Sequence, residues 1–117
     1  MQKEKIDFNM VRELALGLPG IEPGTIHGAP SLKLRGKLFC CPALHGSAEA
    51  NSLVIRMDRA ERTKLLKAQP SVYYVTDHYR DHSTVLVRLA HIDRDSLRDL
   101  LRNAWKFAAA SKATRRA

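Results

Sequence analysis

The sequence contains only two cysteines, which are adjacent at Cys40 and Cys41. Neighbouring residues on a strand point to opposite faces, so a disulfide between these two would need strained geometry. The chain also lacks the long uncharged run that a transmembrane helix needs, and its N-terminus leads into no apolar signal segment. These absences predict a protein without disulfides or membrane contact, located in the reducing cytoplasm.

Several catalytic and cofactor motifs are missing as well. No serine stands in a nucleophile-elbow context, and neither cysteine has a base at motif spacing. The glycines of residues 17–20 follow a helical pattern, whereas phosphate-binding glycine loops follow a strand. Five histidines are present, but no Cys pair or second His pair completes a tetrahedral set with His78 and His82. The sequence therefore favours a non-enzymatic protein that holds no metal and no cofactor.

Acidic residues are scarce relative to basic ones. The chain has 20 Lys and Arg against 12 Asp and Glu, a formal net charge of +8. Half of this excess comes from four cations within the last twelve residues: Lys106, Lys112, Arg115 and Arg116. A basic balance invites a nucleic-acid interpretation. Its distribution, however, predicts a folded body that is only mildly basic, with a basic, solvated tail from about residue 108.

The length and the helix signals define one domain. A chain of 117 residues can bury a core but is too short for two domains, so residues 1–117 are predicted to form a single one. Asp7, Asp58 and Asp93 are good N-caps, and each precedes a helical pattern. Residues 21–30 show no helical period and are rich in Gly and Pro, which predicts turns.

Five segments have the composition of strands. Residues 31–39 alternate polar and apolar side chains on both sides of Arg35-Gly36, a pattern typical of two strands joined by a tight turn. Residues 52–57 form the third candidate strand. Residues 73–76 and 84–89 are β-branched and aromatic. We expect three leucines of the first hairpin to face the core: Leu32, Leu34 and Leu38. The predicted order is α-β-β-β-α-β-β-α, an α+β two-layer domain with an antiparallel sheet of about five strands packed against helices.

The densest polar chemistry lies between the last two predicted strands. Asp77, His78, Tyr79 and Arg80 are consecutive, and residues 81–83 supply turn residues. We therefore expect these side chains in a loop at one rim of the sheet, held by its strands. His27, Asp77, His78 and Tyr79 form a candidate polar cluster. It is interpreted either as a ligand site, which Lys33 could join, or as a satisfied network between the first loop and the central hairpin.

A second candidate site is basic. Lys33, Arg35 and Lys37 are expected on the outer sheet face or at its turn, with Arg80 and Arg88 nearby. Such cations could contact phosphates, or they could simply keep the outer face of the sheet hydrated. The helix after Asp93 carries cations at four-residue intervals interleaved with acids, which is more typical of a solvated face than of a ligand surface.

Three segments resemble the MmcQ/YjbR family. They are Leu18-Pro19-Gly20, residues 27–39, and residues 74–80 with 85–89, and they follow one another in the right order within residues 11–105. The resemblance implies a compact α+β domain of the CyaY-like type. Family members are commonly labelled DNA-binding, and the resemblance implies no catalytic set. The chain departs from the family pattern at Leu32, where Phe is frequent, and at residues 81–83.

The sequence leads to three functional hypotheses. The first is a small, monomeric, non-enzymatic protein that binds DNA through five cations: Lys33, Arg35, Lys37, Arg80 and Arg88. The second is a protein-interaction adaptor that uses the exposed sheet face or the third helix. The third is a small-molecule or enzymatic site at the polar hairpin, built from His27, Lys33, Asp77, His78 and Tyr79. This last hypothesis predicts a pocket at those residues.

Overall fold

The computed structural model of the protein describes residues 6–114, with side chains described up to residue 110. Four α-helices are present in this part of the chain: α1 (Phe8–Ala15), α2 (Arg59–Ala68), α3 (Asp77–Arg80) and α4 (Arg94–Thr114). Six strands form one sheet: β1 (Ile21–Ile26), β2 (Ala29–Leu34), β3 (Lys37–Pro42), β4 (Ser52–Arg56), β5 (Tyr73–Tyr74) and β6 (Thr84–Arg88). A short 3-10 turn, η1 (Leu89–His91), links β6 to α4.

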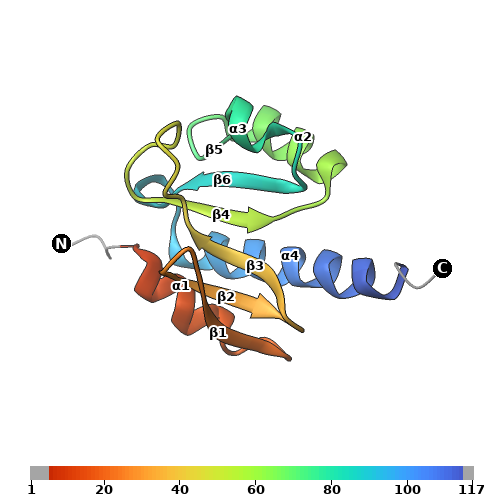
Figure 1. The fold of residues 1–117 in the computed structure, drawn as a ribbon. Helices are drawn as coiled ribbons and strands as arrows, with labels where there is room; N and C mark the ends of the chain where they lie inside the picture. The colour runs from red at the N-terminus through yellow and green to blue at the C-terminus, as the bar shows by residue number, and fades with distance from the viewer. Residues whose placement is uncertain (1–5, 115–117) are drawn as a thin grey trace.

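The sheet is entirely antiparallel, with strand order β1-β2-β3-β4-β6-β5. Figure 1 shows it as a twisted open sheet with α4 running across its back and α1 beside β1 and β2. The α+β, two-layer prediction is therefore confirmed. The predicted number of strands was too low, because the sheet has six strands and not five.

The additional strand is β1, which lies in the passage predicted to consist of turns. Pro23 and Gly24 are residue types that are rare in strands, so the sequence indicates turns here. In the structure Pro23 pairs with Leu32 and Gly24 with Ser31 in a regular ladder. Because β1 lies at the edge of the sheet, the missing N–H of a proline removes no bond from a central position. Pairing with β2, which the local sequence does not encode, decides the conformation here.

Two tight turns shape the first three strands. His27 and Gly28 have φ values of 51° and 80°, and Arg35 and Gly36 have φ values of 53° and 83°. Positive φ at both central residues defines a type I′ turn, whose twist matches that of a two-residue hairpin. The tight turn predicted at Arg35-Gly36 is thus confirmed. The equivalent turn at His27-Gly28 places His27 at a hairpin tip.

The three predicted N-caps are confirmed. Asp7 accepts a hydrogen bond from the Met10 amide at 3.2 Å, Asp58 from Glu61 at 3.3 Å, and Asp93 from Ser96 at 2.7 Å. Helix α4 continues to Thr114, and residues 115–117 of the predicted basic tail lie outside the described residues. None of the helices within residues 6–114 is both long and apolar enough to cross a bilayer.

Residues 77–80 are not a plain loop. They form one helical turn, α3, directly after β5. A four-residue helix is too short to show a periodic pattern, and Thr76 caps it without a side-chain hydrogen bond, so the sequence carries no signal for it. The turn brings His78 and Tyr79 onto one side of the sheet.

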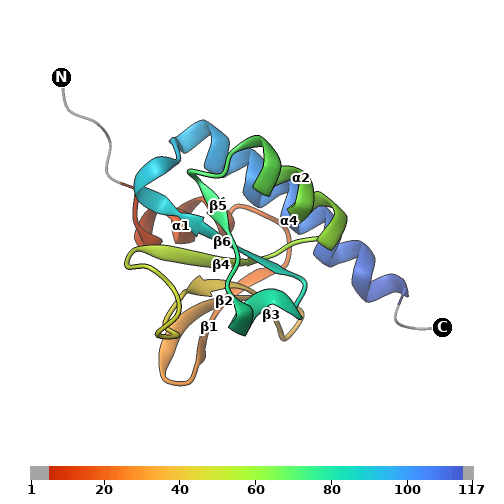
Figure 2. The ribbon, with the colours of Figure 1, turned by 90° about the horizontal axis from the view of Figure 1, so that it is seen from above.

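The sheet separates two clusters of apolar side chains. The larger one lies on the inner face, where α1, α2 and α4 pack, and includes the fully buried Phe39, Leu53 and Ile55. On the outer face, Cys41, Val54 and Leu86 form a smaller cluster. Figure 2 shows this division: α2 and α4 lie on one side of the sheet, and α3 lies on the other.

Leu38 faces outward, which corrects the expectation that it belongs to the inner core. The ladder between β2 and β3 shifts register, since Leu32 pairs with Cys40 while Lys33 pairs with Leu38. The extra residue, Phe39, makes a β-bulge. Phe39 and Cys40 consequently both enter the inner core, and Leu38 and Cys41 pack on the outer face.

Candidate functional site

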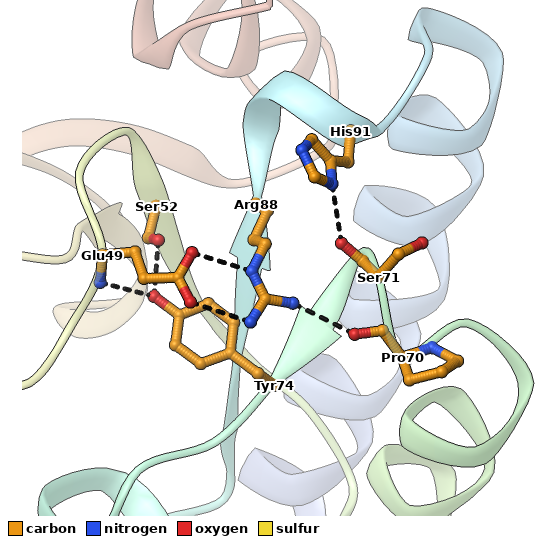
Figure 3. A network of polar contacts seen from close by, with 7 residues as sticks. All are labelled: Glu49, Ser52, Pro70, Ser71, Tyr74, Arg88 and His91. Atoms are coloured by element: carbon orange, nitrogen blue, oxygen red, sulfur yellow. Dashed lines mark hydrogen bonds and ion pairs between the residues drawn. The ribbon is translucent and has the colours of Figure 1, made fainter.

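The connection from β3 to β4, residues 43–51, lies against the outer face and is referred to below as the strap. The carboxylate of Glu49 receives two hydrogen bonds of 2.8 Å from Nε and Nη2 of Arg88 on β6. The Tyr74 hydroxyl accepts from the Glu49 amide at 2.8 Å and lies 2.6 Å from the Ser52 hydroxyl. Figure 3 shows these contacts converging on Glu49 and Tyr74. They fasten the C-terminal half of the strap to β5 and β6.

A second set of contacts fastens the strap near its other end. The Ser47 amide donates to Nδ1 of His45 at 3.0 Å, and the Ser47 hydroxyl lies 2.9 Å from that of Thr76. The His45 ring stacks on His78 of α3, with centroids 3.5 Å apart and an interplanar angle of 9°. Tyr79 meets both imidazoles edge-on. These three rings connect the strap to α3.

A groove of about 430 Å³ lies between the strap, α3 and the β1–β2 hairpin tip. Its apolar lining comes from Ile26, Leu38, Pro42, Leu44 and Val54. Its remaining lining residues are His27, Cys41, His45, His78 and Tyr79. Leu44 is 66% exposed, one of the two exposed large apolar side chains among the described residues. The groove is therefore mostly apolar, with imidazole and phenol rings at its walls.

The groove brings together three of the four residues of the predicted polar cluster. His27 reaches it from the β1–β2 turn, and His78 and Tyr79 reach it from α3. Asp77 does not line it. The Asp77 carboxylate is 95% exposed and lies 3.2 Å from the Arg80 guanidinium, an ion pair within α3 that faces solvent.

Arg88, one of the five cations proposed to contact nucleic acid, is engaged within the protein. Besides its two bonds to Glu49, it donates to the Pro70 carbonyl at 3.0 Å and lies 4.3 Å from the centre of the Tyr74 ring. The Glu49 hydrogen bonds raise the pKa of Arg88, and the same bonds lower the pKa of Glu49. In this arrangement the guanidinium stabilises the strap.

The other four predicted cations occupy different places. Lys33 lies on the outer face, where it pairs with Leu38 and its side chain passes over Gly24. Arg35 stands in the β2–β3 turn and Lys37 at the exposed start of β3. Arg80 is 58% exposed on α3 and pairs with Asp77. Lys33, Arg35 and Lys37 thus share one hairpin, whereas Arg80 belongs to another element.

Partial removal from water shifts the protonation of several groove residues. Desolvation is the main cause that lowers the pKa of His78 below its usual value, and repulsion from His45 and His82 adds to it. Burial raises the pKa of the Tyr79 phenol, although a hydrogen bond with the His45 backbone lowers it in part. Burial also raises the pKa of the Cys41 thiol. At neutral pH these groups offer a neutral, hydrogen-bonding wall.

The lowered pKa of His78 predicts a loss of stability on mild acidification. The folded protein binds fewer protons at this site than the unfolded chain, so the contribution is present above the usual histidine value of 6.5 and is lost as the pH falls through the lowered pKa. We expect His78→Asn to flatten the dependence of the unfolding midpoint on pH between 7.5 and 5. A wild-type slope in His78→Asn would contradict this assignment.

The apolar lining of the groove was not predicted from the sequence, nor were the strap residues Leu44, His45 and Glu49. Their segment was predicted only as a connection between strands, and their partners lie 33 or 39 positions away in the chain. A short polar loop gives no periodic signal for such pairings. Within the described residues, no group of three or more His, Cys, Asp or Glu is arranged to hold a metal ion.

Comparisons with known proteins give relatives and one family. The uncharacterised proteins Rv2570 of Mycobacterium tuberculosis and Mb2600 of Mycobacterium bovis are each 36% identical to the chain over 52 residues. Each match covers 44% of this chain and 40% of the relative's length. No solved structure matches the chain. The model of the YjbR family matches residues 16–107, which include every strand of the sheet and the groove. The chain belongs to the YjbR family.

Proposed function

We propose that this protein is a non-enzymatic binding module that takes a small organic ligand in the groove on its outer face. The observation that carries the proposal is the convergence of His27, His78 and Tyr79 around one apolar groove of about 430 Å³. Small-molecule sites are typically concave, mostly apolar, about 300 to 1,000 Å³ in volume, and furnished with a few convergent polar groups. The groove has each of these properties.

The walls of the groove are held in place by the fold. Leu38, Cys41 and Val54 belong to β3 and β4, inside the sheet. The strap that carries Leu44 and His45 is fastened to β6 through Glu49 and Arg88. A preformed site loses little side-chain entropy on binding, which favours affinity.

The proposal is tested by titrating the protein with 2-naphthamide and 2-naphthoate while following backbone amide signals by NMR. We expect shifts concentrated at the groove residues. Leu44→Ala should weaken binding about three- to tenfold, because less apolar surface is covered. Leu16→Ala is the matched control, since Leu16 is the other exposed leucine, 39% exposed, and does not line the groove. The absence of groove shifts with both probes would refute the proposal.

Binding of nucleic acid is a second candidate function. It is favoured by the net charge of +8 and by three cations on the β2–β3 hairpin: Lys33, Arg35 and Lys37. Arg80 is paired with Asp77, and Arg88 with Glu49. Each arginine can contact a phosphate only when its ion pair is broken.

The nucleic-acid model predicts affinity that falls steeply with salt, because each neutralised phosphate releases a counterion. Arg35→Asn is the informative variant, since asparagine accepts the positive φ of the turn and the change removes charge while preserving the hairpin. Fluorescence anisotropy with short single-stranded and duplex DNA should show weaker binding and a salt slope smaller by about one. Unchanged affinity and slope would exclude Arg35 from the interface.

A further inference from the structure

The chemistry of the groove restricts which ligand can occupy it. This inference rests on the proposed function, because it concerns the same groove. None of the residues that line the groove is an aspartate or a glutamate. The carboxylate of Asp77 on α3 is turned to Arg80 and solvent, and Glu22 on β1 pairs with Lys33 across β1 and β2. The groove therefore carries no negative charge that would repel an anion.

The strap supplies a hydrogen-bond donor to the groove. Nδ1 of His45 accepts from the Ser47 amide, so in the neutral imidazole the proton resides on Nε2. The Ser47 hydroxyl also lies 2.8 Å from Nδ1, which leaves Nε2–H as the donor still available to a ligand. An acceptor group on the ligand satisfies that donor.

Lys33 stands beside the apolar floor without lining the groove, between Leu38 on β3 and Glu22 on β1. It pairs with Leu38 across β2 and β3, and directly opposed residues on one sheet face have Cβ atoms about 5 Å apart. Leu38 lines the groove. The Lys33 stem passes so close over Gly24 that a Cβ built there would lie 3.2 Å from Lys33 Cδ. The glycine thus allows the lysine to lie flat along the outer face.

The rings at the wall favour a flat, unsaturated ligand. His45 and His78 are stacked, and Tyr79 meets each of them edge-on at 6.2 and 4.7 Å between centroids. A further ring extends such a cluster by stacking or by an edge-to-face contact. The apolar side chains of Leu44 and Val54 cover the remaining surface of a ring.

From these features we propose that the groove binds a small aromatic carboxylate. The ring lies in the apolar part of the groove against the histidine and tyrosine rings, and the carboxylate meets Lys33 and the Nε2–H of His45. A charge-assisted hydrogen bond distinguishes this ligand from a neutral analogue of equal size.

The test compares 2-naphthoate with 2-naphthamide, which share a ring system and differ in charge. By isothermal titration at pH 7.5 we expect naphthoate to bind about tenfold or more tightly than naphthamide. Lys33→Gln should remove most of this preference and leave naphthamide affinity unchanged. Lys67→Gln, which removes a lysine from α2 on the other side of the sheet, is the matched control and should keep the preference.

The outcomes separate the two proposals. If both probes bind the groove with equal affinity, the aromatic-carboxylate inference is overturned while the binding groove stands. If Lys33→Gln leaves the preference intact, the contact between the carboxylate and Lys33 is overturned. If neither probe binds, the proposed function fails as well.

Discussion

Replacing Arg62 by methionine is expected to destabilise the protein by about 2 to 4 kcal/mol. Arg62 lies on α2 and is only 9% exposed. Its guanidinium donates to the carbonyls of His82 and Thr84 at 2.9 Å each and to that of Arg80 at 3.1 Å. Methionine keeps much of the apolar stem but removes the guanidinium donor from these partly buried carbonyls, although that of His82 keeps its bond from the Thr84 amide. Chemical denaturation should show a lower midpoint with an unchanged slope.

The contacts of Arg62 are specific to a guanidinium. Burial lowers the pKa of Arg62, and the neighbouring Arg59 and Arg80 lower it further, yet an arginine remains protonated at neutral pH. A lysine has one nitrogen and cannot reach three carbonyls in a fixed plane, so Arg62→Lys should recover only part of the lost stability.

Arg59→Met is the matched control for this prediction. Arg59 lies one turn earlier on α2 and donates to the Asp81 carbonyl at an exposed site, so its loss should cost less than about 1 kcal/mol. A wild-type denaturation midpoint for Arg62→Met would contradict the assigned role. The result bears on function, because the segment held by Arg62 follows directly from the α3 turn that carries His78 and Tyr79.

Features that depend on local contacts could be predicted from the sequence. Asp7, Asp58 and Asp93 cap helices through bonds to the amide three residues ahead, and such contacts are encoded within one turn. The β2–β3 turn is encoded in the same way by Arg35-Gly36. The α+β architecture followed from the order of the predicted elements, and the match of the YjbR model over residues 16–107 confirms the family resemblance.

Features that depend on distant contacts could not be predicted. Strand β1 forms despite Pro23 because its partner β2 supplies the ladder, and α3 forms without any periodic signal. The histidine stack joins residues 33 positions apart, and the Glu49–Arg88 pair joins residues 39 positions apart. Periodicity reports which side of an element is buried but not which segment covers it.

Arg88 shows how contacts between distant residues affect a functional prediction made from the sequence. An arginine at the end of a strand is a reasonable phosphate contact when only its charge and position are known. The structure adds a carboxylate, a carbonyl and an aromatic ring around the guanidinium. Those groups satisfy its donors and make the strap part of the folded domain. The same contacts convert the strap into one wall of the groove.

Releasing the strap is therefore expected to open the groove and expose Cys41. Cys41 is 8% exposed and lines the groove, whereas Cys40 is fully buried in the inner core. Glu49→Gln keeps one acceptor oxygen for the Arg88 guanidinium and replaces the other by an NH2 group, which cannot accept the second bond. We expect the rate of Cys41 alkylation by iodoacetamide at pH 8.5 to rise about tenfold, because the strap opens more often.

The controls assign this effect to the strap. Glu13→Gln removes a carboxylate from α1, on the other face of the sheet, and should leave the rate unchanged. Cys41→Ser identifies the reacting thiol, and in Glu49→Gln/Arg88→Gln the second change should add little, because the two residues act as a pair. Hydrogen exchange should rise at strap residues 43–51 and stay unchanged in β4. If the alkylation rates of wild type and Glu49→Gln are equal, the pair does not hold the strap closed, and the groove wall depends on the His45–His78 stack instead.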